Sequence, residues 1–121
     1  MVKQQCAYII EDDVDLGNGF AAIIKNIGLN TKVIHDGQEA WDKLMEYAPD
    51  VVVLDMHLPN VSGTDILNLI RSNANLSETR VVVISADPVM VAESNRIANY
   101  ALLKPVKMQQ LVKVVKRLSE R

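Results

Sequence analysis

The stretch Val51-Val52-Val53-Leu54-Asp55-Met56-His57-Leu58-Pro59 decides the fold of this chain. Its first four residues are apolar and three of them are β-branched, which is typical of a strand buried on both faces of a parallel sheet. The apolar run stops at the carboxylate of Asp55, and Pro59 with Gly63 predicts a loop before the next helix. Because ligands of open α/β sheets bind at the carboxyl ends of the strands, we expect Asp55 to lie in such a crevice.

Strands and helices alternate along the whole chain. Apolar runs rich in β-branched residues predict strands at residues 6–10, 31–34, 51–54, 80–84 and 100–103. Apolar residues at helical spacing predict five helices, of which the first runs from Asp15 to Gly28. The second buries Trp41, Leu44, Met45 and Ala48 and stops at Pro49. The others are predicted over 63–73, over 89–98 and from about Met108. Residues 73–79 are predicted to be a polar loop. Five β/α units without a linker or repeat predict an α/β fold with a parallel sheet and helices on both faces.

Composition limits the class of protein. A length of 121 residues fits one domain, residues 1–121, and 49% hydrophobic with 23% charged residues is typical of a soluble globular chain. The formal charge of −2 leaves no basic footprint for direct nucleic acid binding by this domain. Cys6 is the single cysteine, and the chain has neither an apolar run of membrane-spanning length nor a secretion signal. We therefore expect a cytoplasmic domain without membrane contact.

Polar and charged residues follow directly where the predicted strands end. Glu11 and Asp12 follow the first strand, Asp55 the third, Ser85 the fourth and Lys104 the fifth. Three carboxylates in one crevice raise one another's pKa unless a cation lies between them, and all-oxygen ligation suits Mg²⁺. One ammonium and one hydroxyl fit a phosphoryl group whose charge the metal shares. The pattern therefore indicates Asp55 as the nucleophile that forms an aspartyl phosphate.

Each of these residues also has a purely structural interpretation. Glu11 and Asp12 are acids of the kind that favour a helix N-terminus. Ser85 is a common turn residue, and Lys104 is ordinary at a protein surface. Because all of them lie at the ends of four predicted strands, a shared functional site is favoured over separate structural roles.

The chain resembles the receiver domain of two-component response regulators in four motifs, which follow the family's order. They are Ile9-Ile10-Glu11-Asp12, the segment 53–59 with Gly63, Val83-Ile84-Ser85-Ala86, and Lys104-Pro105. The resemblance covers essentially the whole chain. It implies a chemotaxis-regulator-like, flavodoxin-like fold, in which a doubly wound sheet has the strand order 2-1-3-4-5 and five helices. It also implies a cis bond between Lys104 and Pro105, which is common in the family.

The resemblance implies a signalling switch. Asp55 would accept a phosphoryl group from a sensor histidine kinase or a phosphotransfer protein, in line and with Mg²⁺. Ser85 would hydrogen-bond the phosphoryl oxygen, and Lys104 would pair with it. The domain would assist its own phosphorylation and dephosphorylation without being an enzyme. Its output would pass through the fourth helix, fifth strand and fifth helix to an effector protein, to a C-terminal output domain outside this chain, or to a second copy in a phosphorylation-dependent homodimer.

The same resemblance implies a set of magnesium ligands. Asp12 and Asp55 would bind the ion directly, the backbone carbonyl of His57 would supply a further ligand, and Glu11 would act through a water. Asp13 lies one place past the family's acidic pair and is not assigned to the metal.

Ala101 departs from the family's pattern. Members usually have Tyr or Phe three residues before the lysine, and the nearest aromatic residue here is Tyr100. A shift of one position turns a strand residue to the opposite face, so we expect that Tyr100 does not replace the ring. A pseudo-receiver, which binds partners without phosphorylation, is therefore the alternative function. His57 and Asp87 occupy positions that tune phosphate lifetime in the family.

Two other functions rest on local patterns. Gly17-Asn18-Gly19-Phe20-Ala21-Ala22 matches a dinucleotide-binding pattern, with Asp36 as a candidate ribose ligand. Its first glycine lies far from the end of the strand, and the acids within residues 11–15 would repel a pyrophosphate. A phosphatase with an aspartate nucleophile would need a second acid where His57 stands. Both functions are therefore disfavoured.

The last predicted helix is basic. Lys113, Lys116 and Arg117, with Arg121, give it a charged face, which is most often a solvated surface and otherwise a docking surface. Trp41 is expected to be a core or half-buried helix residue rather than a ligand platform.

Overall fold

A five-stranded sheet forms the centre of the molecule, whose computed structural model describes residues 4–120. The strands are β1 (Cys6–Ile10), β2 (Asn30–Ile34), β3 (Val51–Asp55), β4 (Arg80–Ser85) and β5 (Tyr100–Leu103). All neighbouring strands are parallel, and their order is β2-β1-β3-β4-β5, which confirms the predicted order. The strand β3 is buried along its whole length at the centre of the sheet.

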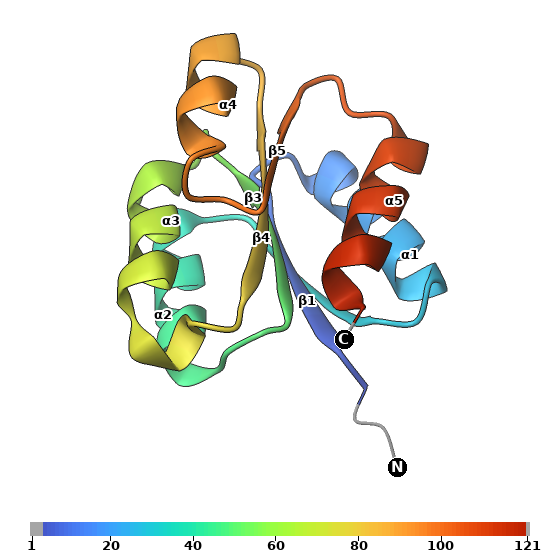
Figure 1. Cartoon of the computed structure of the whole chain (residues 1–121), viewed down its shortest axis with the longest axis horizontal. Helices are drawn as coiled ribbons and strands as arrows, with labels where there is room; N and C mark the ends of the chain where they lie inside the picture. Colours follow the sequence, from blue (N-terminus) through green and yellow to red (C-terminus); the bar gives the residue numbers. More distant parts are fainter. Residues whose placement is uncertain (1–3, 121) are drawn as a thin grey trace.

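Helices cover both faces of the sheet. They are α1 (Val14–Asn26), α2 (Gly37–Glu46), α3 (Gly63–Ser72), α4 (Pro88–Ser94) and α5 (Met108–Ser119), with a 3-10 turn η1 at Ala74–Leu76. The helices α1 and α5 lie side by side on one face, and α2, α3 and α4 cover the other (Figure 1). This arrangement is the doubly wound, flavodoxin-like α/β fold. Within residues 4–120, no helix has the length and apolar character needed to cross a bilayer.

Two apolar cores flank the sheet, because successive strand residues point to opposite faces. The α2–α3 core includes Tyr8, Leu54 and Val83. The α1–α5 core includes Val53 and Val82 from the other face of the same strands. The apolar stripes predicted for the third and last helices are buried in these cores; they are Ile66, Leu67 and Ile70 in α3, and Leu111, Val114, Val115 and Leu118 in α5.

Short polar side chains fix where four of the five α-helices begin. Each accepts a hydrogen bond from a backbone N–H of the first helical turn, which satisfies a donor that has no partner within the helix. They are Asp13 for α1, Asp36 for α2, Ser62 for α3 and Asp87 for α4. The helix α5 instead begins after Lys107, with no hydrogen bond from a side-chain cap.

The helix α4 is shorter than the sequence predicted. It ends at Ser94 rather than Ala98, and the amide of Ala98 bonds back to the carbonyl of Ser94 in a turn. The side chain of Asn99 then accepts a 2.7 Å hydrogen bond from the amide of Val81. The prediction was wrong because the apolar residues of this segment form no continuous stripe that a longer helix could bury.

The helix α2 also ends earlier than predicted. It stops before Tyr47, whose backbone is extended, instead of reaching Pro49. A proline disfavours the helical conformation in the residue before it, so the chain leaves the helix early. Met45 and Ala48, predicted to face inward, are exposed, whereas Trp41 is half-buried against the α2–α3 core as expected.

The predicted polar loop after α3 contains a buried anchor. Its turn η1 carries Leu76, which is fully buried in the α2–α3 core. Thr79 is also buried, and its hydroxyl donates a 2.8 Å hydrogen bond to the carbonyl of Pro49. The segment therefore packs as part of the fold, although most of its residues are polar.

Candidate functional site

The strand register brings the predicted site residues to one edge of the sheet. In the ladder, Asp55 lies opposite Ile84, so Ser85 is the next residue at the same edge. Glu11 follows the last residue of β1, and the amide of Lys104 donates a 2.8 Å hydrogen bond to the carbonyl of Ser85. Parallel strands thus deliver residues that are distant in sequence to a common crevice, as the sequence predicted.

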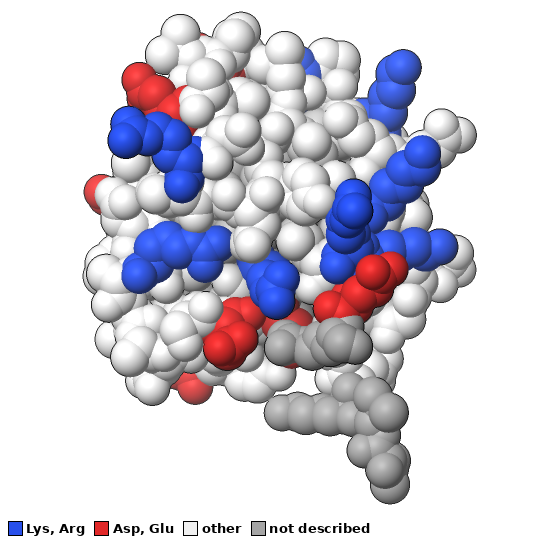
Figure 2. All heavy atoms as spheres, viewed as in Figure 1, with Lys and Arg blue, Asp and Glu red and all other residues white. Residues whose placement is uncertain are grey.

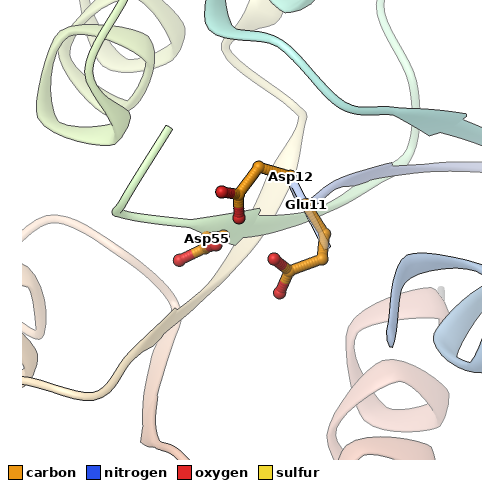
Figure 3. A group of neighbouring side chains, drawn as sticks. All are labelled: Glu11, Asp12 and Asp55. Atoms are coloured by element: carbon orange, nitrogen blue, oxygen red, sulfur yellow. The ribbon is translucent and has the colours of Figure 1, made fainter. Parts of the chain in front are cut away.

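Three carboxylates converge at this edge (Figure 3). One carboxylate oxygen each from Glu11, Asp12 and Asp55 lies within 4.8 Å of the others. Glu11 is only 1% exposed and Asp55 only 3%, whereas Asp12 is open to solvent. Two carboxyl groups are therefore held in the protein interior, with a third beside them at the opening.

Lys104 is the cation of this cluster. Its Nζ lies 3.0 Å from Glu11 Oε1 and 3.4 Å from Asp55 Oδ2. Backbone amides bind the other oxygens: Asp13 donates to Glu11 Oε2 at 3.2 Å, and His57 donates to Asp55 Oδ1 at 3.0 Å. One ammonium group faces three carboxylates, so the cluster keeps an excess of negative charge.

Burial and the neighbouring groups shift the pKa values of the cluster. Burial first, and then the hydrogen bond with Asp55, raises the pKa of Glu11 to about 8 despite the opposing effect of Lys104. Burial would also raise the pKa of Asp12, but its hydrogen bonds with Glu11 and Asp55 outweigh burial and leave that pKa below its usual value. Burial would lower the pKa of Lys104, but its bond with Glu11 and the charge of Asp55 hold that pKa above its usual value.

Ser85 connects the site to the start of α4. Its side chain is buried, and its Oγ accepts a 3.0 Å hydrogen bond from the amide of Asp87. The carboxylate of Asp87 in turn accepts from the amide of Val89 in the first turn of α4. Because a hydroxyl both donates and accepts, the Ser85 proton can still be donated to an oxygen at the crevice.

Two residues near the site have structural roles that were not predicted above. His35 Nδ1 lies 2.9 Å from the backbone carbonyl of Glu11. This contact depends on the pairing of β1 with β2, which also bonds the amide of Glu11 to the carbonyl of Ile34. Asp13 uses its carboxylate to cap α1 through the amide of Leu16. No local sequence pattern identifies the His35 contact, whereas the acid directly before an apolar-periodic segment indicates the Asp13 cap.

The dinucleotide-binding alternative is wrong. Gly17 and Gly19 lie inside α1 rather than in a loop after β1. A Cβ on Gly17 would lie 3.1 Å from Cγ1 of Val33, so this glycine allows close packing of α1 on β2. A phosphate-binding loop needs glycines whose backbone is open to the ligand, and these are not.

The edge strand β5 confirms the expected orientation of its aromatic residue. Tyr100 packs against the α1–α5 core, and Ala101 packs against the α2–α3 core. Tyr100 thus lies on the opposite face from the position where receivers usually carry a ring. The bond between Lys104 and Pro105 is cis, as the resemblance implied.

Known proteins with similar sequences are response regulators. The DNA-binding response regulator MtrA of Mycobacterium tuberculosis is 30% identical over 114 residues, which cover 90% of this chain and 48% of MtrA. The transcriptional regulatory protein TrcR of the same organism is 32% identical over 115 residues, which cover 93% of this chain and 44% of TrcR. The chain therefore spans about half the length of the curated relatives it matches.

Solved structures show the same fold. The receiver domain of DrrB activated with BeF3 has a TM-score of 0.87 at 26% identity, with 98% of this chain and 100% of that chain covered. The chemotaxis response regulator CheY4 of Vibrio cholerae has a TM-score of 0.86 at 19% identity, with 96% of this chain and 99% of that chain covered. The family model described as the response regulator receiver domain matches residues 7–116. The chain therefore belongs to the response regulator receiver domain family.

Proposed function

We propose that Asp55 accepts a phosphoryl group and that the domain is a phosphorylation-dependent signalling switch. The observation that carries this proposal is the buried Asp55 carboxylate, which lies beside two further carboxylates and 3.4 Å from the ammonium of Lys104. A carboxylate in such a place can act as a nucleophile, and the neighbouring ammonium can pair with the negative charge of the group that it accepts. Membership of the receiver family supports the same function.

The acidic cluster fits a magnesium ion. Its side-chain donors are all oxygens, and among residues 4–120 only the ammonium of Lys104 forms ion pairs with these carboxylates. In the proposal, Asp12, Asp55 and the backbone carbonyl of His57 hold the ion, and Glu11 acts through a water. Bound there, Mg²⁺ would share the charge of the phosphoryl oxygens.

The chain's own side chains would carry the transfer. A carboxylate oxygen of Asp55 attacks the phosphorus of a phosphohistidine; the new O–P bond forms while the P–N bond breaks, and its electron pair stays on the departing imidazole. Lys104 pairs with a phosphoryl oxygen, and the hydroxyl of Ser85 donates a hydrogen bond to another. Attack of water on the same phosphorus then releases phosphate and restores the carboxylate.

The donor in this proposal is a sensor histidine kinase or a phosphotransfer protein. When the Ser85 hydroxyl turns to the phosphoryl group, its bond to the amide of Asp87 is the first to be disturbed, so the change reaches α4. The surface of α4, β5 and α5 would then control a downstream effector protein, an output domain elsewhere in a longer chain, or a phosphorylation-dependent homodimer. A cytoplasmic location fits such a pathway.

Incubation with acetyl phosphate, with and without Mg²⁺, followed by intact mass spectrometry, tests the proposal. We expect a Mg²⁺-dependent gain of one phosphoryl group that Asp55→Asn abolishes. Asp65→Asn is the matched control, because it also converts an acid to an amide but lies exposed on α3; it should leave the gain intact. A folded protein that gains no phosphoryl group and binds no beryllofluoride would overturn the proposal in favour of the pseudo-receiver.

A further inference from the structure

A hollow lies between α2 and α3, on the face of the sheet opposite α1 and α5. Figure 1 shows these two helices packed side by side. The hollow has a volume of about 470 Å³, which falls within the range of roughly 300–1,000 Å³ that is typical of small-molecule pockets. Its lining includes Gln38 and Trp41 from α2, Asp65, Asn68 and Leu69 from α3, and Val61 from the loop between β3 and α3. No residue of the acidic cluster at Asp55 lines it.

The wall of the hollow at Val61 is held in place by the start of α2. The carbonyl of Pro59 accepts hydrogen bonds from the amides of Gly37 at 3.0 Å and Val61 at 2.9 Å. The side-chain amide of Asn60 donates to the carboxylate of Asp36, the N-cap of α2. A Cβ on Gly37 would overlap the carbonyl oxygen of Val61, so only glycine allows this close approach. The wall is therefore already formed, and a ligand would not have to order it.

Trp41 gives the hollow an aromatic surface. The sequence predicts a core or half-buried residue here, and the side chain is indeed half-buried against the α2–α3 core. The same side chain also lines the hollow, together with the buried Leu69. An indole ring packs well on a flat apolar body, and its face attracts cations. Trp41 therefore contributes to the hollow as well as to the core.

Asp65 supplies a carboxylate whose oxygens are not used within the described chain. Its backbone amide donates to Ser62 Oγ at 3.1 Å, but its side chain forms no hydrogen bond or ion pair with another of residues 4–120. The position in the first turn of α3 favours an acid through the helix dipole, and this leaves both carboxylate oxygens available. The side-chain amide of Asn68 likewise has no partner among residues 4–120 and offers both a donor and an acceptor.

Negative charge surrounds the hollow. With their N-cap residues, α2 and α3 carry five acids and two cations; these are Asp36, Glu39, Asp42, Glu46 and Asp65, and Lys43 and Arg71. The guanidinium of Arg71 is bound to the segment between α4 and β5, at the far end of α3. Lys and Arg side chains are instead spread over the face of the molecule that Figure 1 presents (Figure 2). The charge near the hollow therefore favours a positively charged ligand.

We propose that the hollow between α2 and α3 binds a small organic cation, whose charged group pairs with Asp65 and whose apolar body packs on Trp41 and Leu69. A small organic anion would be repelled by the acids of α2 and α3. A bare divalent metal ion would find a single carboxylate in the lining, which is too few oxygen ligands from the protein. Binding in this hollow does not depend on the phosphoryl chemistry of Asp55.

Intrinsic fluorescence tests the site directly, because Trp41 is the single tryptophan of the chain. The probes are benzamidine, benzamide and benzoate, which have similar shapes and carry a positive charge, no charge and a negative charge. We expect benzamidine to change the Trp41 emission saturably, with a Kd in the millimolar range that is usual for so small a ligand. Benzamide should bind about fivefold more weakly, because it lacks the ion pair, and benzoate more weakly still.

The variant Asp65→Asn tests the assigned ion pair. It should weaken benzamidine binding by about fivefold and leave benzamide binding unchanged. The matched control is Asp15→Asn, which removes the same charge from an exposed position in the first turn of α1, on the other face of the sheet. The control should change benzamidine binding by less than about twofold. In NMR spectra, amide shifts induced by benzamidine should map to α2, α3 and Val61.

Four results would overturn the inference. They are no saturable change with benzamidine, equal affinity for benzamidine and benzamide, equal weakening by Asp65→Asn and Asp15→Asn, and amide shifts centred on another part of the chain. Shifts centred on Glu11, Asp12 and Asp55 would identify the acidic cluster as the site of the cation instead. Labelling by acetyl phosphate is measured separately, and Asp65→Asn should leave it intact, so a failure of this inference remains distinct from a failure at Asp55.

Discussion

Tyr100 and Ala101 are neighbours in β5, yet they pack into different cores on opposite faces of the sheet. The ring of Tyr100 faces away from α4, so it has no direct route by which to report a change at Asp55 to that helix. We expect Tyr100→Phe to leave the amide shifts that beryllofluoride induces in α4 unchanged. A large loss of those shifts would show that the ring takes part in the switch.

The variant Ala101→Phe tests the opposite face of β5. It places a ring in the α2–α3 core beneath α4, where Met90 already packs. We expect a cost of about 1–3 kcal/mol in the free energy of unfolding, because a larger side chain against a packed core forces its neighbours to shift. We also expect altered amide shifts in α4 before any phosphodonor is added. NMR spectra and urea denaturation of Tyr100→Phe and Ala101→Phe compare the effects of changes on the two faces of β5.

The acidic cluster makes the site locally unstable. In buffer without Mg²⁺, Asp55→Asn should raise the free energy of unfolding by about 1 kcal/mol, because it removes a buried carboxylate that lies beside two further acids. Lys104→Met should lower it by about 1–3 kcal/mol, because it leaves Glu11 and Asp55 without their shared cation. Urea denaturation measures both. Destabilisation by Asp55→Asn would contradict the charge argument.

Gly63 at the start of α3 is constrained by the end of β3. A Cβ there would lie 2.4 Å from Cα of Met56 and 2.8 Å from the carbonyl oxygen of Asp55. We expect Gly63→Ala to cost about 3 kcal/mol and to weaken Mg²⁺ binding, because the backbone beside Asp55 must shift. Gly19→Ala is the control within α1, where the new methyl meets only the end of Met108; it should stabilise the fold by about 0.5 kcal/mol. Equal stabilities of the two variants would refute the packing argument.

Arg71 ties the end of α3 to the segment between α4 and β5. Its guanidinium donates to the carbonyl of Ile97 at 2.6 Å, to the carbonyl of Thr79 at 3.0 Å and to Asn99 Oδ1 at 2.8 Å. Lysine cannot reproduce this planar fork, so Arg71→Lys should cost about 1–2 kcal/mol. Hydrogen exchange should increase in residues 95–99. Arg96→Lys, on the exposed turn after α4, should change neither measurement.

Tyr8 gives the fold a dependence on alkaline pH. The side chain is 5% exposed, and burial, followed by the neighbouring Cys6, Tyr47 and Glu46, raises the pKa of Tyr8 from 10 to about 12. Above pH 10 the unfolded chain loses this proton and the folded chain keeps it, so stability falls between pH 10 and 12. Tyr8→Phe should lose less stability over that range in urea denaturation than the wild type does. An unchanged slope in Tyr8→Phe would contradict the raised pKa.

Much of the fold and the grouping of the site could be predicted because both depend on local patterns. The apolar run before Asp55 indicates a buried strand, and a polar residue directly after such a run must lie at the carboxyl edge of a parallel sheet. The same reasoning places Glu11, Ser85 and Lys104 at that edge. Their chemical roles remain predictions, which the labelling experiment tests.

The features that the sequence did not predict depend on tertiary contacts. Helix propensity does not fix the end of α4, which follows from the turn at Ser94 and the bond from Val81 to Asn99. The contact of His35 with the Glu11 carbonyl requires the register of β1 with β2. Leu76 looked like one apolar residue in a polar loop, and only packing shows that it is an anchor. In each case the residues in contact are not related by the periodicity of a helix or a strand, so a sequence pattern cannot predict the contact.

The ion pair between Lys104 and Glu11 joins residues of the first and last strands, which are far apart in the sequence. During synthesis, Glu11 leaves the ribosome well before Lys104, and β3 and β4 must assemble between β1 and β5 before the two residues can meet. A nascent or cleaved chain that lacks β5 has the acids without their cation. The acidic cluster therefore gains its cation only with the complete sheet. If Asp55 accepts a phosphoryl group as proposed, a fragment that ends before β5 should not be labelled by a phosphodonor.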